Sequence, residues 1–386
     1  MRTLMAYTEE IDDIESAIAS IKTQLDSQGV LAANTVGLIC CHSEFVNSGV
    51  TAALGAALPF DVTGIITMNQ ACEAARGQLL LTLAVLTGDD VDFVVGMTGD
   101  INIDARGAIE TTYRELSAQK QEAPVMALIM APFSFINLGD DYANILSAVS
   151  DGLPCFGTMA IDDSDDLQNC YMIFNEEACV DKLSMVLIYA NVKPRFVLAT
   201  ISEDRILPKP ALVTKSDRAI LQAVNGKPVR EFFENLGLGE ASEERYAMSS
   251  FPFMLDYNDG TPPVSKVFVD TTPDGAAVCA GRVPEGATIY VGMFNKEDVL
   301  KTTGHAIDEA LSDIEGKSFM LMYSCVSRSM SLANESMAEV DLVREKIGGR
   351  LPFMMGYSGG ELCPTRVSNS VAINRFHNNT FIACIL

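Results

Sequence analysis

The sequence predicts an α/β (α+β) protein of two domains, in which mixed β-sheets are covered by helices. The chain has 386 residues, more than the roughly 250 to 300 at which a single hydrophobic core usually stops growing. Apolar residues make up 48% of the chain, enough for two packed cores. Short apolar runs alternate with amphipathic segments throughout. A four-layer αββα sandwich is the alternative, because both halves hold more strands than one parallel sheet would use.

The first half opens with a predicted amphipathic helix over residues 8–26. Its isoleucines recur every three or four residues, and Thr8 can cap its first turn. A second helix is expected over residues 47–58, ended by Pro59. The further elements expected in this half are helices at 109–120 and 142–149 and strands at 36–41, 62–67, 79–87, 92–96, 125–130, 171–174, 183–190 and 195–200.

A linker is expected between the two halves. Pro208 and Pro210 are close enough together to favour an extended chain over the interior of a helix or strand. We therefore place the domain boundary here, which gives domains of residues 1–207 and 208–386. The second domain is expected to hold strands at 266–269, 277–280, 288–293 and 319–323 and helices at 298–314 and 335–347.

The charge excludes two classes of partner. Lysine and arginine total 27 against 51 acidic residues, a formal net charge of −24. Such a surface repels nucleic-acid phosphates and anionic lipid headgroups. The longest apolar runs are far shorter than the ~20 residues that cross a bilayer, so no membrane insertion is expected. The first residues lack a basic region followed by an apolar stretch, and we therefore expect a cytoplasmic protein.

Cofactor and metal motifs are missing from the sequence. It contains neither G-x-G-x-x-G after a strand nor the P-loop pattern, so the usual phosphate cradles of nucleotide cofactors are lacking. The cluster Cys40-Cys41-His42 lacks the further ligands that a tetrahedral metal site needs, and no C-x-x-C pair occurs. We expect no metal and no intrinsic cofactor.

Two enzymatic readings can be weighed. Residues 356–360 (GYSGG) fit the G-x-S-x-G nucleophile elbow, but Pro364 stands where the helix after the elbow would begin, and Glu361 is the only acid between Ser358 and His377. This argues against a serine hydrolase. The alternative left open is a thiol- or carboxylate-dependent hydrolase or transferase acting on a small amide or ester, with Cys325 and His377 brought together by the fold.

Three C-terminal segments carry a resemblance to a known family. They are residues 323–328 (YSCVSR), residues 351–364 (LPFMMGYSGGELCP) and residues 377–380 (HNNT). This order resembles the closing signature of the FIST C-terminal domain: a strand ending in S/N-C-x-x-R, a G-[FY]-x-x-x-G-E-x-x-P loop and a final H-N-x-T strand.

The resemblance continues upstream over nearly the whole chain. Residues 211–215 (ALVTK) and 224–229 (VNGKPV) are similar to the family's V-T-x and L-N-G-K-P-A segments. Residues 153–160 (LPCFGTMA) resemble its P-x-x-G-G-x-A loop, with Thr158 in place of the second glycine, and residues 64–73 resemble its first glycine-containing loop. The resemblance implies a FIST N-terminal-like domain over 1–207 and a FIST C-terminal-like domain over 208–386.

FIST proteins are regarded as sensory modules, often joined to signalling output domains, and amino acids have been proposed as their ligands. The resemblance therefore implies a sensor for a small metabolite such as an amino acid. No output domain is recognisable in this sequence, so we expect the output partner to be a separate protein. A third reading, a scaffold without a small ligand, predicts no enclosed polar pocket and a large exposed apolar patch.

The expected site suits a zwitterion. Arg328 offers a planar fork for a carboxylate, and Glu361, on a glycine-rich loop, offers an anion for an ammonium group. The structural alternative is that these two side chains pair with each other. The further expected ligand-binding residues are Cys325, Tyr357, Gly359, Gly360 and Asn378. The structural alternatives are that Cys325 and Tyr357 pack in the core and that Asn378 is a turn or strand-end residue that satisfies backbone groups.

Overall fold

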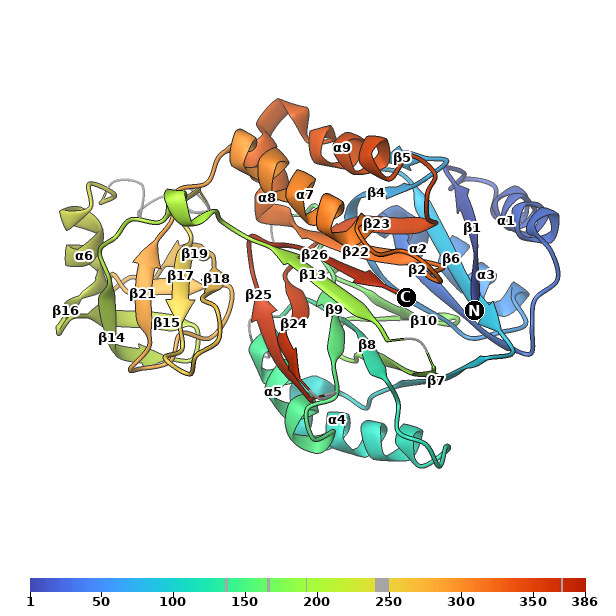
Figure 1. Cartoon of the computed structure of the whole chain (residues 1–386), viewed down its shortest axis with the longest axis horizontal. Helices are drawn as coiled ribbons and strands as arrows, with labels where there is room; N and C mark the ends of the chain where they lie inside the picture. The colour runs from blue at the N-terminus through green and yellow to red at the C-terminus, as the bar shows by residue number, and fades with distance from the viewer. Residues whose placement is uncertain (135, 137, 165–166, 192, 240–249, 369–370) are drawn as a thin grey trace.

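The protein consists of a large body and a small domain beside it, as Figure 1 shows. The computed structural model describes residues 1–134, 136, 138–164, 167–191, 193–239, 250–368 and 371–386. Mixed sheets covered by helices make up the body, which confirms the expected class. Three sheets, and not the two of the four-layer alternative, face one another here.

The three sheets of the body share one strand order. The first sheet runs β1-β6-β2-β3-β10-β11, the second β7-β12-β8-β9-β24-β25 and the third β13-β26-β22-β23-β4-β5. Each contains one parallel pair at its centre, β2–β3, β8–β9 or β22–β23, and its other pairs are antiparallel. Leu38, Leu128 and Tyr323, one from each sheet, belong to a single buried cluster. The three sheets therefore enclose a common core.

This order reflects three structural repeats along the chain. The first comprises β1 (Arg2–Thr8), α1 (Ile14–Gln28), β2 (Asn34–Cys41), α2 (Ser43–Asn47), α3 (Val50–Ala57), β3 (Val62–Ile66), β4 (Met68–Cys72), β5 (Arg76–Gly77) and β6 (Leu81–Gly88). The second comprises β7 (Val91–Met97), α4 (Ile101–Ser117), β8 (Met126–Ala131), α5 (Gly139–Val149), β9 (Cys155–Met159), β10 (Met172–Phe174), β11 (Glu177–Cys179) and β12 (Ser184–Ala190). The third comprises β13 (Arg195–Ala199), α7 (Lys296–Leu311), β22 (Met320–Cys325), α8 (Val326–Leu332), α9 (Ala338–Ile347), β23 (Phe353–Ser358), β24 (Glu361–Ser368), β25 (Val371–His377) and β26 (Phe381–Ile385).

The repeats exchange their hairpins in a cycle. The β4–β5 hairpin of the first repeat pairs with β23 in the third sheet, and the β24–β25 hairpin of the third pairs with β9 in the second. The β10–β11 hairpin of the second pairs with β3 in the first. Each sheet therefore depends on strands from two repeats, which ties the ends of the chain together.

A glycine at the equivalent place in each repeat allows a close approach. Gly64 of β3 and Gly157 of β9 lie opposite Ile39 and Ile129, and a Cβ at either glycine would overlap the partner's carbonyl oxygen. Gly356 of β23 holds the same register position, where a Cβ would come within 2.8 Å of a threonine side chain. Only glycine leaves this room for the neighbouring backbone or side chain.

The small domain is inserted into the third repeat, between β13 and α7. It has one sheet, β18-β17-β21-β14-β15-β20-β19, with β16 paired to β15, and its own buried core. Its elements are β14 (Ala211–Asp217), β15 (Ile220–Val224), β16 (Lys227–Pro228), α6 (Val229–Asn235), β17 (Phe253–Asp256), β18 (Val264–Lys266), β19 (Phe268–Thr271), β20 (Ala277–Cys279) and β21 (Thr288–Val291). The expected proline linker leads into its first strand.

Ionic contacts attach the small domain to the second repeat. Lys266 is fully buried, and its Nζ lies 2.8 Å from Asp140 Oδ1 and 2.7 Å from the Phe376 carbonyl oxygen. Beside it Arg282 Nε donates to Asp141 Oδ1 at 2.6 Å. These pairs join strand β18 and the loop after β20 to the start of α5.

The sequence misplaced the first element. Residues 2–8 form strand β1, and the predicted helix over 8–26 begins only at Ile14, where the cap is Asp13 and not Thr8. The Asp13 carboxylate accepts the Ser16 N–H at 3.0 Å. The ranges 1–207 and 208–386 contribute strands to the same second and third sheets. The division at this boundary itself stays a prediction.

Candidate functional site

The candidate site is a cavity of about 200 Å³ between the body and the small domain. Its body side is formed at the carboxyl ends of the parallel strands: Phe133 follows β8, Ile161 follows β9, Cys325 ends β22 and Gly359 follows β23. All three repeats converge here, since Met68 follows β3. Carboxyl ends of strands are where ligands bind in open α/β sheets.

The walls of the cavity are apolar with a few polar groups. The small domain adds its own side, with Val267, Val269 and Ala280 from the β18–β20 region. The polar lining residues are Asp162, Asp163, Ser164, Ser327, Cys325 and Asn378. An apolar cavity with few convergent polar groups is the usual form of a small-molecule site, and this volume is below the ~300 Å³ of drug-sized pockets.

Asn378 lines the cavity and has a polar side-chain atom without a partner in the described part of the chain. It is 1% exposed, and its Nδ2 has no hydrogen-bond partner among the described residues. Its Oδ1 accepts the Val267 N–H at 3.4 Å, and the backbone N–H of Asn378 donates to the Ser265 carbonyl at 3.0 Å. A buried amide donor without an acceptor costs about 1–3 kcal/mol. A ligand acceptor in the cavity would remove that cost.

Two neighbouring carboxylates follow strand β9. Asp162 is buried, and its Oδ2 accepts the Ser164 hydroxyl at 2.6 Å and the Asn169 N–H at 3.2 Å. Asp163 is 43% exposed, and its Oδ2 lies 3.3 Å from His42 Nε2. His42 Nδ1 accepts the Glu44 N–H at 3.3 Å, so Nε2 carries the ring proton and donates to Asp163. These groups give this part of the cavity a negative charge.

Cys325 lies at the junction of β22 and α8, where it lines the cavity as expected. Its Sγ accepts the Ser327 hydroxyl at 3.2 Å. Burial, reinforced by the nearby Glu361, raises the pKa of the Cys325 thiol to about 12. The group is therefore an uncharged thiol at neutral pH and contributes to the wall as a small apolar side chain.

The two loop glycines have different roles. Gly359 lines the cavity, and a Cβ there would come within 2.8 Å of Phe133 Cδ2. Gly360 lies behind it with φ +133°, and a Cβ there would overlap the Phe376 ring and come within 3.0 Å of Asn378 Nδ2. The glycine at 360 therefore leaves the space that the Asn378 amide occupies.

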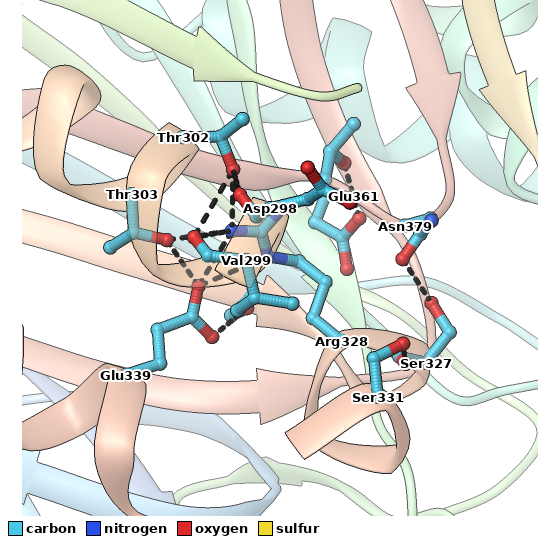
Figure 2. Close-up of polar contacts among 12 residues, drawn as sticks. Asp298, Val299, Thr302, Thr303, Ser327, Arg328, Ser331, Glu339, Glu361 and Asn379 are labelled. Atoms are coloured by element: carbon cyan, nitrogen blue, oxygen red, sulfur yellow. Dashed lines mark hydrogen bonds and ion pairs between the residues drawn. The ribbon is translucent and has the colours of Figure 1, made fainter. Parts of the chain in front are cut away.

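Arg328 is enclosed in the protein and does not line the cavity. It is 0% exposed, and its guanidinium pairs with Glu339 of α9, with Nη2 2.8 Å and Nε 3.0 Å from Glu339 Oε1. Nη2 also lies 2.6 Å from Thr303 Oγ1 and 3.1 Å from the Val299 carbonyl oxygen in α7. Figure 2 shows Arg328 reaching these partners from α8. The arginine joins three helices.

Glu339, the acid of this pair, accepts hydrogen bonds from further side chains. Glu339 Oε1 also accepts the Thr303 hydroxyl, and Oε2 accepts the Ser324 hydroxyl at 2.8 Å. Burial and the neighbouring Glu339 raise the pKa of Tyr357, which is fully enclosed and does not line the cavity. Among the described residues only Arg328 Nη1 in this cluster of charged groups lacks a partner, and the Phe294 ring lies 5.2 Å from the guanidinium carbon.

Glu361 is buried beneath the cavity and is hydrogen-bonded within the protein. Its Oε2 accepts the Thr380 hydroxyl at 2.6 Å, and its Oε1 accepts the Ser358 hydroxyl at 3.1 Å. Burial raises the pKa of Glu361 to about 8, although the hydrogen bonds and Arg328 act in the opposite direction. Arg328 and Glu361 thus have separate partners and do not form the ion pair that was the structural alternative.

Two family models match the chain. The FIST N domain matches residues 35–227 and the FIST C domain matches residues 229–364. The chain belongs to the FIST family. FIST domains are sensory domains for small ligands, and this favours a non-enzymatic role. A search of curated proteins gives no match.

The described residues of this FIST protein show none of the contacts that the enzymatic alternative requires. His377 Nε2 lies 3.3 Å from the Cys363 carbonyl oxygen, and no hydrogen bond joins His377 to Cys325 in the described part of the chain. Burial lowers the pKa of His377 to about 3, so the ring is neutral. Ser358 ends β23 and a strand follows at Glu361, so it does not stand on a strand-to-helix elbow.

Of the seven expected site residues, Cys325, Gly359 and Asn378 line the cavity of this FIST protein, and the other four are not among its lining residues. The sequence analysis missed Asp162 and Asp163. A signal was present, because both lie within three residues of the 153–160 segment, which carries the family resemblance and contains β9. No pattern in the sequence marked the small-domain residues Val267, Val269 and Ala280 as lining residues.

Two structural searches complete the description. Over the described ranges, no three His, Cys, Asp or Glu side chains converge on a metal-sized site. No helix in the part of the chain that the structure describes is both long enough and apolar enough to cross a bilayer.

Proposed function

We propose that the protein is a cytoplasmic sensor that binds a small metabolite, an amino acid or a related amine, in the cavity beside Cys325, Gly359 and Asn378, and signals to a separate output protein. The observation that supports this most strongly is that Asn378, which lines the apolar cavity, has a buried amide donor without a partner among the described residues. Arg328, Glu361, Tyr357 and Gly360 support the wall from behind in this proposal.

The position of the cavity suggests how binding would be transmitted. Val267, Val269 and Ala280 of the small domain line it, and Lys266 immediately before them pairs with Asp140 of the body. A sensor needs two states of different ligand affinity. A ligand that contacts both sides of the cavity would favour one position of the small domain relative to the body. Scattering profiles with and without ligand should therefore differ. Superimposable profiles would contradict this route.

A thermal-shift screen tests ligand binding itself. The purified protein is screened against amino acids, amines, small organic acids and nucleotides. A ligand at 100 times its dissociation constant stabilises the folded state by about 2.7 kcal/mol, which raises Tm by several degrees.

Two variants locate the site. Ala280→Leu adds volume to the cavity wall, whereas Ala118→Leu makes the same change at an exposed position at the end of α4. We expect a hit for the wild type and Ala118→Leu that is lost in Ala280→Leu. A screen without hits, or hits that Ala280→Leu leaves unchanged, would contradict the proposal.

A further inference from the structure

We infer that the ligand of the cavity is a small apolar amine that carries a neutral hydrogen-bond acceptor and no free carboxylate. The inference rests on the proposed function, that the cavity binds a small metabolite, and it narrows the class of ligand. Three features carry it: the charge of the wall, a donor in the wall that lacks a partner among the described residues, and the enclosure of Arg328, the residue after Ser327 of the wall.

The wall is negatively charged. Asp162 and Asp163 line it, and no lysine, arginine or histidine is among the described residues that do so. The sequence from residue 161 to 170 (IDDSDDLQNC), which follows β9, holds no basic residue. A free carboxylate in this cavity would face two like charges, and such juxtaposition across an interface costs several kcal/mol. An ammonium group would be attracted.

His42 does not cancel this charge. Its ring contacts Asp163 through Nε2, but Nδ1 accepts a backbone N–H from Glu44 and so carries no proton. In this arrangement Nε2 donates to the Asp163 carboxylate and holds it in place. Asp163 lines the cavity and is 43% exposed, so its carboxylate is accessible.

Arg328, the residue after Ser327 of the cavity wall, is paired elsewhere. Arg328 pairs with Glu339 inside the fold and contacts Thr303 and Val299. It is 0% exposed, and it does not line the cavity, although the adjacent Ser327 does. A ligand carboxylate therefore has no guanidinium fork to bind, which is the usual partner of such a group.

The free donor of the wall fits a neutral acceptor. Asn378 Oδ1 is occupied by the Val267 N–H, whereas Nδ2 has no partner among the described residues. A carboxamide or ketone oxygen would accept from Nδ2 without bringing a negative charge. The remaining surface, formed by side chains such as Met68, Phe133 and Val269, suits an apolar body.

Four probes that share one apolar body separate these features. Leucinamide has both the amine and the amide; leucine has the amine and a carboxylate; 3-methylbutylamine has only the amine; 4-methylpentanamide has only the amide. Calorimetric titration of the full chain at slightly acidic pH, where the amines are protonated, should show leucinamide binding at least about tenfold more tightly than leucine. The two single-group probes, 3-methylbutylamine and 4-methylpentanamide, should both bind more weakly than leucinamide.

Two variants assign each group to its partner. Asp163→Asn keeps an acceptor for His42 and should weaken leucinamide but not 4-methylpentanamide. Asn378→Leu removes the free donor and should weaken leucinamide but not 3-methylbutylamine. Asp26→Asn, on the exposed face of α1, removes one negative charge far from the cavity and should leave all four affinities unchanged.

The outcomes separate this inference from the proposed function. Leucine binding as tightly as leucinamide would overturn the amine class while the sensor proposal stands. So would unchanged binding of both leucinamide and 3-methylbutylamine in Asp163→Asn. The same holds if only organic acids or nucleotides from the wider screen bind. If no compound of either panel binds, both proposals fail.

Discussion

Two buried polar regions lie next to each other at the end of β22, and they differ in how completely the protein satisfies them. Around Arg328 and Glu339, helices α7, α8 and α9 supply partners for almost every polar atom. At the cavity, Asn378 keeps a donor without a partner. The first arrangement fixes the fold, whereas the second leaves hydrogen-bonding capacity for another molecule. Variants of the two regions should therefore affect different measurements.

The largest expected effect is on the Arg328–Glu339 pair. Glu339→Leu leaves a buried guanidinium without its acid, so the free energy of unfolding should fall by about 3–5 kcal/mol. Urea denaturation measures this. The double variant Arg328→Met with Glu339→Leu should recover much of the loss, because it buries no charge. A single variant as stable as the wild type would show that the pair does not hold the helices.

The next effect is at Gly360, between the two regions. Gly360→Ala forces a residue with a Cβ into φ +133° and against the Phe376 ring, so we expect a loss of about 1–3 kcal/mol. Gly226→Ala is the matched control, because its φ is also positive, +78°, but no atom lies within 4 Å of the added Cβ. Equal losses in the two variants would mean that backbone conformation alone, and not the Phe376 contact, sets the cost.

The pH dependence of stability distinguishes the polar groups beneath the cavity. The pKa of Glu361 is raised to about 8 from an ordinary 4.5, so in this interval the folded protein holds a proton that the unfolded chain has lost. The free energy of unfolding should therefore fall as pH rises through the interval.

His377 opposes this trend at the acidic end, because its pKa is lowered to about 3 from 6.5 and the unfolded chain binds the extra proton below pH 6.5. The contribution of Glu361 is best measured above that value. Urea titrations there should give falling stability in the wild type and a flatter profile in Glu361→Gln. Identical slopes in the two proteins would contradict the assignment.

The smallest effect on stability is expected at the cavity wall. Asp163→Asn changes a half-exposed side chain and keeps an acceptor for His42, so unfolding should change by less than about 0.5 kcal/mol. The affinity of Asp163→Asn for leucinamide should nevertheless be lower than that of the wild type. A large loss of stability in Asp163→Asn would place this residue with the structural cluster and not with the cavity.

Much of the local structure was readable from the sequence, and the long-range pairing was not. Apolar runs located β2, β8 and β12, whereas the segments that form β9 and β23 were expected as glycine-containing loops. The three repeats escaped notice because the small domain separates β13 from α7 and because each hairpin pairs within another repeat. Sequence periodicity reports local structure and carries no information on such exchanges.

The site was half predictable for a related reason. Cys325, Gly359 and Asn378 stand at strand ends within family motifs, and strand ends converge. The partner of Arg328 could not be read in the same way, because Glu339 is one of many acids in the chain and stands on a separate helix, 11 residues further on. The acid that pairs with a buried arginine is determined by how the helices pack. The spacing of residues along the sequence does not predict this packing.

The most direct test is a crystal structure of the protein with the tightest-binding compound from the amine panel. The account predicts that the compound lies in the cavity between the body and the small domain, with its acceptor within hydrogen-bond distance of Asn378 Nδ2 and its ammonium group towards Asp163. A compound bound at another surface, or one whose carboxylate displaces Glu339 from Arg328, would contradict it.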